Sequence, residues 1–255
     1  MLRPSDRAAL RQKRDEARAI WNSSRDFAAP ILPLSANRNI ISSENEKMTD
    51  PIFRRADDSS DEAFYAAPRF VTHIDAGAIA AVTQLYREFL PKGGAILDLM
   101  TSWVSHLPPE ITYSSVTGLG MNAAELAANP RLTTRIVQNL NTSPVLPFDT
   151  ASFDGACICV SVDYLTQPVQ VLREVGRVLK NSAPLVITFS NRCFPTKVIA
   201  PWLALNDAER VELVEGFIKT TGNFAGVTAL NRSPARGDPL YAVIGHAATR
   251  NISRS

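Results

Sequence analysis

The sequence predicts a doubly wound α/β fold, in which helices cover both faces of a mostly parallel, seven-stranded sheet. From residue 65 onward, apolar runs of strand length alternate with segments whose apolar residues recur at three- and four-residue intervals. Strands that are separated by helices pair in parallel. The last two apolar runs are joined by only a Pro/Gly loop, so the final strand should run antiparallel to the others.

The first predicted element of the domain is a helix that begins near Thr72. The stretch Thr72-His-Ile-Asp75 has the spacing of a capping box, with Asp75 in place of the usual glutamate. Apolar residues then recur at helical spacing as far as Phe89. Pro91 and the glycine pair that follows it should end the helix near Leu90.

Two apolar runs should form the centre of the sheet. The strand from Ala95 to Met100 carries a single carboxylate near its end, as in the first central strand of a doubly wound sheet. A second run, from Asp154 to Val162, should be buried on both faces. Between them we expect, in order, a strand at residues 116–119, a helix at 122–128 and a strand at 135–140.

The second half of the chain continues the alternation. The helix from Pro168 to Lys180 begins with a proline in its first turn and separates apolar from charged residues on its two sides. Asn206 and Glu209 have cap spacing for a further helix, which Gly222 should close. Strands are expected at residues 185–189, 225–230 and 240–245.

Length and composition allow one well-packed domain with an appendage. The chain has 255 residues, of which 45% are hydrophobic and 20% are charged. We place a single domain at residues 62–248, a poorly ordered N-terminal extension at 1–61 and a tail at 249–255. No apolar run approaches the ~20 residues that a membrane-spanning helix needs, so we expect a soluble, cytoplasmic protein.

The N-terminal extension allows three interpretations. Its polar, proline-containing composition is typical of disordered segments, and translation that starts at Met48 would omit most of it. Its Arg, Ala and Ser content also fits an organelle transit peptide at residues 1–47, although Asp6, Asp15 and Glu16 interrupt the basic face. A partner-binding arm is the third interpretation.

The charge distribution argues against a nucleic-acid partner. Residues 1–47 hold nine Lys/Arg and six Asp/Glu, whereas the rest of the chain holds 18 and 19. The predicted domain therefore lacks the concentrated basic face that a nucleic-acid groove requires. We also expect no metal site, because three cysteines and two of the histidines have no ligand spacing: Cys157, Cys159, Cys193, His73 and His246.

Three consecutive stretches resemble a known family. They are Leu146-Pro-Phe-Asp-Thr-Ala-Ser-Phe-Asp-Gly155, Leu172-Arg-Glu-Val-Gly-Arg-Val-Leu-Lys180 and Leu185-Val-Ile-Thr-Phe-Ser-Asn191. In order and sequence they are similar to class I S-adenosylmethionine-dependent methyltransferases of the small-molecule type (methyltransferase type 11). The resemblance implies a Rossmann-like methyltransferase fold, S-adenosylmethionine as the cofactor and a small-molecule acceptor.

The cofactor loop departs from the pattern of that family. The family carries an acid and three glycines after its first strand, because glycine permits positive φ and close approach of the backbone to the cofactor. Here Met100, Ser102 and Val104 follow Asp98 where those glycines belong. Each of these residues has a Cβ where the cofactor would lie in the resembled family. Thr101 or Ser102 could instead cap a short helix whose amides face the cofactor carboxylate.

The second characteristic residue of the family is an acid at the end of the second strand, which binds the ribose. In this sequence Gly120 occupies that position. The amides of Asn122 or Asn139 could bond the ribose or adenine instead, with weaker hydrogen bonds than a charged group makes. In doubly wound sheets the ligand lies beyond the carboxyl ends of the strands. The resemblance and the fold together place cofactor-binding residues at Asp98, Met100, Ser102, Trp103, Gly118, Gly120, Asn122, Asn139, Leu140 and Ser161.

His106 is the candidate general base, because imidazole titrates near neutrality and methyl transfer to oxygen or nitrogen can require removal of a proton. The alternative for His106 is a helix-terminal histidine that bonds the backbone near Pro108. Trp103 could stack on adenine or lie over a sulfonium, or could belong to the core. The segment at residues 191–206 is a candidate lid or acceptor wall.

Two functions from different classes follow. The first is S-adenosylmethionine-dependent methyl transfer to an unidentified small-molecule acceptor. The second is a catalytically inactive, methyltransferase-like binding or scaffold protein whose crevice no longer accepts the cofactor. A nicotinamide oxidoreductase is a distant third, because no G-x-G-x-x-G follows a predicted strand. The sequence predicts neither the acceptor nor the oligomeric state.

Overall fold

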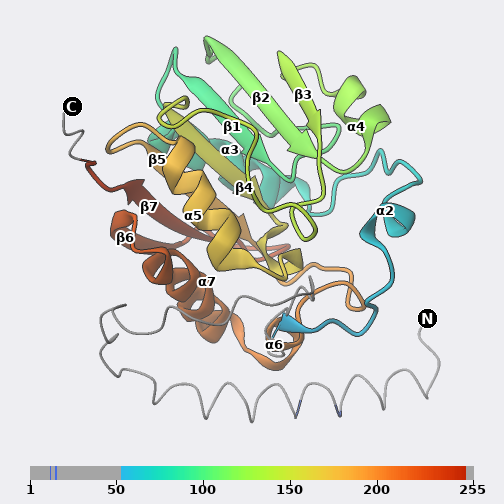
Figure 1. Cartoon of the computed structure of the whole chain (residues 1–255). Coiled ribbons are helices and arrows are strands. Elements are labelled where there is room, and N and C mark those ends of the chain that lie inside the picture. Colours follow the sequence, from blue (N-terminus) through green and yellow to red (C-terminus); the bar gives the residue numbers. More distant parts are fainter. Residues whose placement is uncertain (1–11, 13–14, 16–52, 251–255) are drawn as a thin grey trace, which may run out of the picture.

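The predicted sheet is present and holds seven strands in the order β3-β2-β1-β4-β5-β7-β6. The structure is a computed structural model that describes residues 12, 15 and 53–250. Neighbouring strands from β3 to β5 are parallel, whereas β7 runs antiparallel to both β5 and β6. This topology confirms the doubly wound α/β fold (Figure 1).

The strands lie close to their predicted positions and differ mainly at their carboxyl ends. The strand expected to reach Val162 ends at Cys159, because Val160 adopts a φ of 44° and turns the chain. The strand expected at residues 135–140 ends at Val137. The seven strands are β1 (Ala95–Leu99), β2 (Ser115–Gly120), β3 (Thr134–Val137), β4 (Gly155–Cys159), β5 (Pro184–Phe189), β6 (Phe224–Asn231) and β7 (Tyr241–Ala247).

Helices cover both faces of the sheet, with α3 behind it and α5 and α7 in front of it in Figure 1. Their bounds are α2 (Asp61–Phe64), α3 (Ala76–Phe89), α4 (Ala123–Ala128), α5 (Pro168–Val178), α6 (Ala200–Ala204) and α7 (Asp207–Thr221), with a 3₁₀ turn, η2, at Val162–Tyr164. The helices α2 and α6 were not predicted. Both are too short to show a helical period in the sequence.

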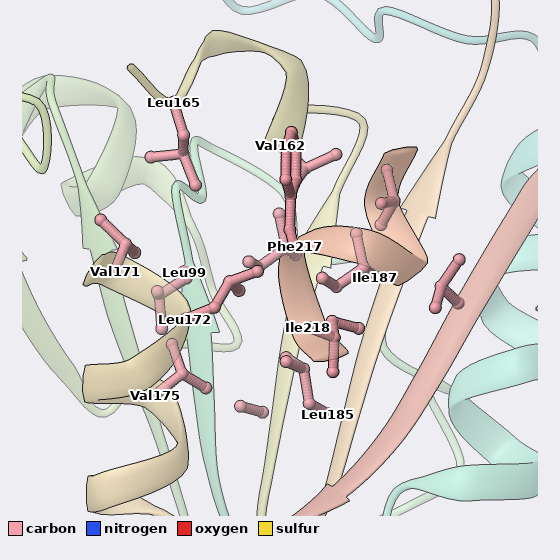
Figure 2. Packing of buried hydrophobic residues seen from close by; sticks show 14 of the residues in the cluster. Leu99, Val162, Leu165, Val171, Leu172, Val175, Leu185, Ile187, Phe217 and Ile218 are labelled. Carbon is pink, nitrogen blue, oxygen red and sulfur yellow. The ribbon is translucent and has the colours of Figure 1, made fainter. Parts of the chain in front are cut away.

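Two apolar cores lie on opposite sides of the sheet. In the first, Leu172 of α5 and Phe217 of α7 pack with Leu99 and Ile187 of the strands (Figure 2). In the second, α3 buries Val82 and neighbouring residues against the other face. Each such side chain stabilises the fold by about 1.5–3 kcal/mol through removal from water. The rigid sheet therefore fixes the strand ends that carry the candidate site.

The helix caps agree with the sequence in two places and differ in one. Asn206 and Glu209 form the expected capping box of α7, and Asn122 caps α4 with its side chain. The helix expected to begin near Thr72 begins at Ala76, because Asp75 itself is the cap and accepts from the amide of Ala78 at 2.9 Å. A carboxylate satisfies free amides at this position as well as a hydroxyl does, which the capping-box spacing alone did not reveal.

Candidate functional site

A cavity of about 570 Å³ opens at the carboxyl ends of β1, β2, β3, β4 and β5. Its volume lies within the range of about 300–1,000 Å³ that is typical of small-molecule sites. The cavity spans the point where strand order reverses, because β1 pairs with β2 on one side and with β4 on the other. Nine of the predicted site residues line it: Asp98, Met100, Ser102, His106, Gly120, Asn122, Asn139, Leu140 and Ser161.

The other two predicted residues, Trp103 and Gly118, are not among the lining residues. The indole nitrogen of Trp103 donates to the carbonyl of Val71 at 3.1 Å, and its ring lies edge-on to Phe70 at 6.4 Å. An added Cβ at Gly118 would lie 2.4 Å from a methyl carbon of Leu132 and 2.9 Å from the methyl carbon of Thr101, in the loop that follows β1. Both residues therefore support the wall of the cavity from outside.

The loop after β1 keeps a glycine-like backbone without the glycine. Met100, at the first glycine position of the resembled motif, has a φ of 54°. This left-handed conformation costs a residue with a Cβ roughly 1–2 kcal/mol. The short helix expected from a cap at Thr101 or Ser102 does not form, because residues 101–113, all of them described, contain no helical turn. The predicted amide cradle at a helix start is thus absent from this loop.

Glycines on the neighbouring strand make room for this loop. The amide of Thr101 donates to the carbonyl of Leu119 at 3.0 Å, so the loop continues the sheet beside β2. A Cβ built on Gly120 would overlap the carbonyl oxygen of Thr101. An acid therefore cannot occupy the position where the resembled family binds the ribose. The loop and the missing acid are two consequences of one packing arrangement.

Asp98 holds the loop in place from the end of β1. Its side chain is only 2% exposed, and the hydroxyl of Thr101 donates to Oδ2 at 2.6 Å. Burial raises the pKa of Asp98 to about 6, while the hydrogen bonds from Thr101, Ser105 and Cys157 act in the opposite direction. Near neutral pH the carboxyl is therefore ionised and anchors the turn.

The predicted amide ligands hold a covering segment in this conformation. We call residues 53–72 the strap, which begins beside α6 and carries α2 (Figure 1). The side-chain amide of Asn122 donates to the carbonyl of Tyr65 at 2.9 Å, and that of Asn139 donates to Glu62 at 2.8 Å. The side chains of Asn122 and Asn139 also accept from the backbone, Asn122 as the cap of α4. Both side chains are thus already engaged by the protein.

A buried lysine fastens the other end of the strap. Lys197 is fully buried, and its ammonium donates to the carbonyl of Ser59 at 2.6 Å and lies 3.4 Å from the carboxylate of Asp57. Arg55 pairs with Asp61 at 2.6 Å in the same cluster. The strap includes residues 53–61, which we had assigned to the poorly ordered extension. The domain boundary itself stays a prediction, since most of residues 1–52 lie outside the described part.

Glu125 is a cavity-lining acid that the sequence did not single out as a ligand. It lies in the first turn of α4 and is mostly buried, and its Oε1 accepts from the amide of Arg69 at 2.7 Å. The cap spacing of Asn122 and Glu125 was visible in the sequence. Its meaning for the site was not, because only the fold brings α4 to the cavity beside the end of β2.

His106 lines the cavity but is not helix-terminal. Its φ is 52°, and its carbonyl accepts from the hydroxyl of Thr83 at 3.0 Å. Burial lowers the pKa of the imidazole below its ordinary value, so the neutral form prevails near pH 7. A neutral imidazole that faces a cavity can accept a proton, as the base role requires.

The end of β4 contributes two buried polar groups. Ser161 lines the cavity, is 8% exposed, and has no hydrogen-bond partner for its hydroxyl among the described residues. Asp163, in η2, likewise lacks a partner for Oδ2 within the described part of the chain. Burial raises the pKa of Asp163 to about 8. Unpaired buried polar groups are costly, and they recur at functional sites.

Known proteins resemble this chain in part of its sequence and in its fold. Residues 99–187 match the family model that is described as a methyltransferase domain. The (4+2)-cyclase SpnF superposes with a TM-score of 0.54 and 14% identity, over 74% of this chain and 92% of that one. A chain from the complex of the Haloferax volcanii Trm112 methyltransferase activator with a putative methyltransferase gives 0.51 and 15%, over 68% and 91%.

At 14% and 15% identity, the solved structures show only that the fold is shared. A comparison with curated proteins gave no match. Within residues 53–250, no helix has the length and apolar composition that crossing a bilayer requires.

Proposed function

We propose that this chain, which belongs to the class I methyltransferase superfamily, binds S-adenosylmethionine and transfers its methyl group to a small-molecule acceptor. The observation that carries the proposal is the placement of backbone strain. Five non-glycine residues of the described part have positive φ, and three of them, Met100, His106 and Val160, line the cavity at the strand ends. Strained residues persist where function requires their geometry.

The lining residues fit the cofactor in spite of the missing glycines. The cavity stays open beside Met100 and Val104, so their side chains do not fill it. Glu125 supplies a carboxylate near the end of β2, where ribose hydroxyls need an acceptor. Leu140 offers an apolar wall after β3. These residues would replace the ribose-binding acid that Gly120 excludes.

Catalysis by such a site requires alignment and the removal of one proton. S-adenosylmethionine, when bound, supplies the electrophilic methyl group. The protein orients the acceptor and excludes water with the strap. His106, neutral near pH 7, is positioned to take the proton of a hydroxyl or amine acceptor. An acceptor that is already ionised would need no base.

Calorimetry of the full chain tests the proposal. S-adenosylmethionine and S-adenosylhomocysteine are titrated into the wild type, Glu125→Gln and the surface control Glu110→Gln. We expect both ligands to bind, with roughly tenfold weaker binding in Glu125→Gln because a charged hydrogen bond becomes neutral. Glu110 is exposed and pairs with Arg87, so its variant should bind as the wild type does. No heat and no thermal shift at millimolar ligand would contradict the proposal.

The rival function is a binding or scaffold protein without catalysis. Two observations favour it: the amides of Asn122 and Asn139 hold the strap, and Gly120 stands where the ribose-binding acid would be. The cyclase among the structural neighbours also shows that this fold is not tied to one chemistry. Cofactor binding without methyl transfer to any tested acceptor would favour this reading.

A further inference from the structure

Aromatic side chains gather around Phe194 in one part of the cavity wall. Phe194, in the loop that follows β5, lies 5.5 Å from the ring of Phe64, 5.4 Å from that of His73 and 6.0 Å from that of Tyr164. The amide of Phe194 donates to the hydroxyl of Tyr164 at 2.8 Å, which fixes the loop to η2. Such a wall favours a flat, apolar ligand body through burial and ring contacts.

A guanidinium lies within this wall without a carboxylate partner. The Cζ of Arg69 is 4.6 Å from the centroid of Phe64 and 5.5 Å from that of Phe194. Its Nη2 donates to the carbonyl of Phe64 at 2.8 Å, whereas its Nη1 has no hydrogen-bond partner among the described residues. Glu125 accepts from the backbone amide of Arg69, and no ion pair joins the guanidinium to a described carboxylate.

A second cation, Arg192, lines the cavity two residues before Phe194. The side chain of Arg192 is 62% exposed, and its nearest described carboxylate, that of Asp238, is 3.8 Å away. Asp238 already accepts from the amide of Asp75 at 3.0 Å. A long, exposed ion pair of this kind contributes little. Arg192 is therefore available to a ligand in the cavity.

Three arginines and three carboxylates line the cavity, and each carboxylate has a partner other than the guanidinium of Arg69 or Arg192. Asp61 pairs with Arg55, Asp98 accepts from the hydroxyl of Thr101, and Glu125 accepts from the backbone amide of Arg69. Burial lowers the pKa of His73, so near pH 7 its ring is neutral and contributes only an edge-on aromatic contact with Phe194. The aromatic wall and the two arginines together define a face for a planar anion.

We infer that the acceptor is an aromatic or conjugated carboxylic acid, whose flat body packs on the wall around Phe194 and whose carboxylate is bound by Arg69 and Arg192. The inference rests on the proposed function, because it names the substrate class of that site. Guanidinium groups match carboxylates in geometry and bind them with charge-assisted hydrogen bonds. A ligand carboxylate would also satisfy the unpaired Nη1 of Arg69 after a small adjustment of the neighbouring rings.

The test compares matched acids and amides. 4-Hydroxybenzoate and indole-3-acetate, each beside its primary amide, are titrated into the full chain with and without saturating S-adenosylhomocysteine. Variants are Arg69→Gln, Arg192→Gln and the control Arg87→Gln, whose side chain pairs with Glu110 on the surface. We expect the acids to bind at least tenfold more tightly than the amides, and each cavity variant to weaken acid binding roughly tenfold. Arg192→Gln guards against misfolding, since its side chain is largely exposed.

The outcomes separate this inference from the proposed function. Equal binding of acid and amide, or cavity variants that behave like Arg87→Gln, would overturn the inference. Binding of S-adenosylhomocysteine without binding of either acid would overturn it as well and leave the proposed function intact. Acid binding without nucleotide binding would support the anion site and contradict methyl transfer. Absence of all binding would contradict both.

Discussion

The carbonyl oxygen of Thr101 lies against Gly120, so closely that no side chain larger than hydrogen fits at that position. The contact joins the loop after β1 to the end of β2 and sets one wall of the cavity. It also explains why the acid of the resembled family is absent from β2. Compared with the resembled family, the loop carries side chains in place of glycines, whereas β2 has no side chain at two positions, Gly118 and Gly120.

Gly120→Ala tests this contact. The added methyl group must push the loop away from β2, and overpacking of this kind costs about 1–3 kcal/mol. The matched control is Gly216→Ala in α7, where nothing lies within 4 Å of the added methyl and alanine favours the helix by roughly 0.5–1 kcal/mol. Urea denaturation should therefore show opposite signs for the two variants. An equally stabilising Gly120→Ala would disprove the close approach.

Met100 allows the backbone strain of the loop to be measured. Glycine normally destabilises a protein relative to alanine, because the unfolded chain gains freedom. At a φ of 54° the order should reverse, and Met100→Gly should be more stable than Met100→Ala by about 1 kcal/mol. Both variants lose the same partly buried side chain beyond Cβ, so their difference in unfolding free energy isolates the backbone. The usual order would show that Met100 is not strained.

The loop after β1 shows how much of the site the sequence predicts. The apolar runs placed β1, β2, β4, β5 and β7, because a buried strand must be apolar whatever packs on it. The alternation of elements placed the edge strands β3 and β6, whose residues are half-buried or exposed. The loss of three glycines after Asp98 was visible as well. The compensation by Gly118 and Gly120 was not visible, because it depends on a contact between the loop after β1 and β2 that only the folded sheet creates.

The strap illustrates the same limit. Its helix α2 has four residues, which give no period to detect. Its contacts reach far along the chain: Arg69 bonds to Glu125 and Lys197 to Ser59. A fully buried lysine is rare, and its charge would ordinarily predict a surface position. The sequence therefore assigned residues 53–61 to a loose extension, although their partners lie in the loop before α6.

Lys197→Met should release the strap. Removing one member of a buried ion cluster leaves Asp57 and Asp61 less well paired and typically costs about 3–5 kcal/mol. The control Lys219→Met removes an exposed pair with Glu215, for which about 0–1 kcal/mol is expected. Hydrogen exchange reports the local effect, because the amide of Asp57 is bonded to the carbonyl of Thr196. Amides at residues 57–66 should exchange faster in Lys197→Met alone, and unchanged protection would refute the fastening role.

Asp163 should make the protein less stable as pH rises, which is the opposite of the effect of a carboxylate whose pKa is lowered by folding. Burial raises its folded pKa to about 8, whereas the ordinary value is 3.8. Between these values the folded chain binds more protons than the unfolded chain, so the contribution of Asp163 to the unfolding free energy falls as pH rises. The fall begins near pH 4 and levels above about pH 8.

Asp163→Asn removes the titration and keeps the shape, so its stability relative to the wild type should rise over that pH range. Each pKa unit corresponds to about 1.4 kcal/mol, so the gain between the two ends of the range should exceed about 1 kcal/mol. Urea denaturation across the range measures the difference, with the exposed Asp149→Asn as the control. Parallel pH profiles of wild type and Asp163→Asn would contradict the raised pKa, and would mean that the buried carboxylate is stabilised by a partner. The constant difference between the two profiles would then measure only the cost of burying the amide.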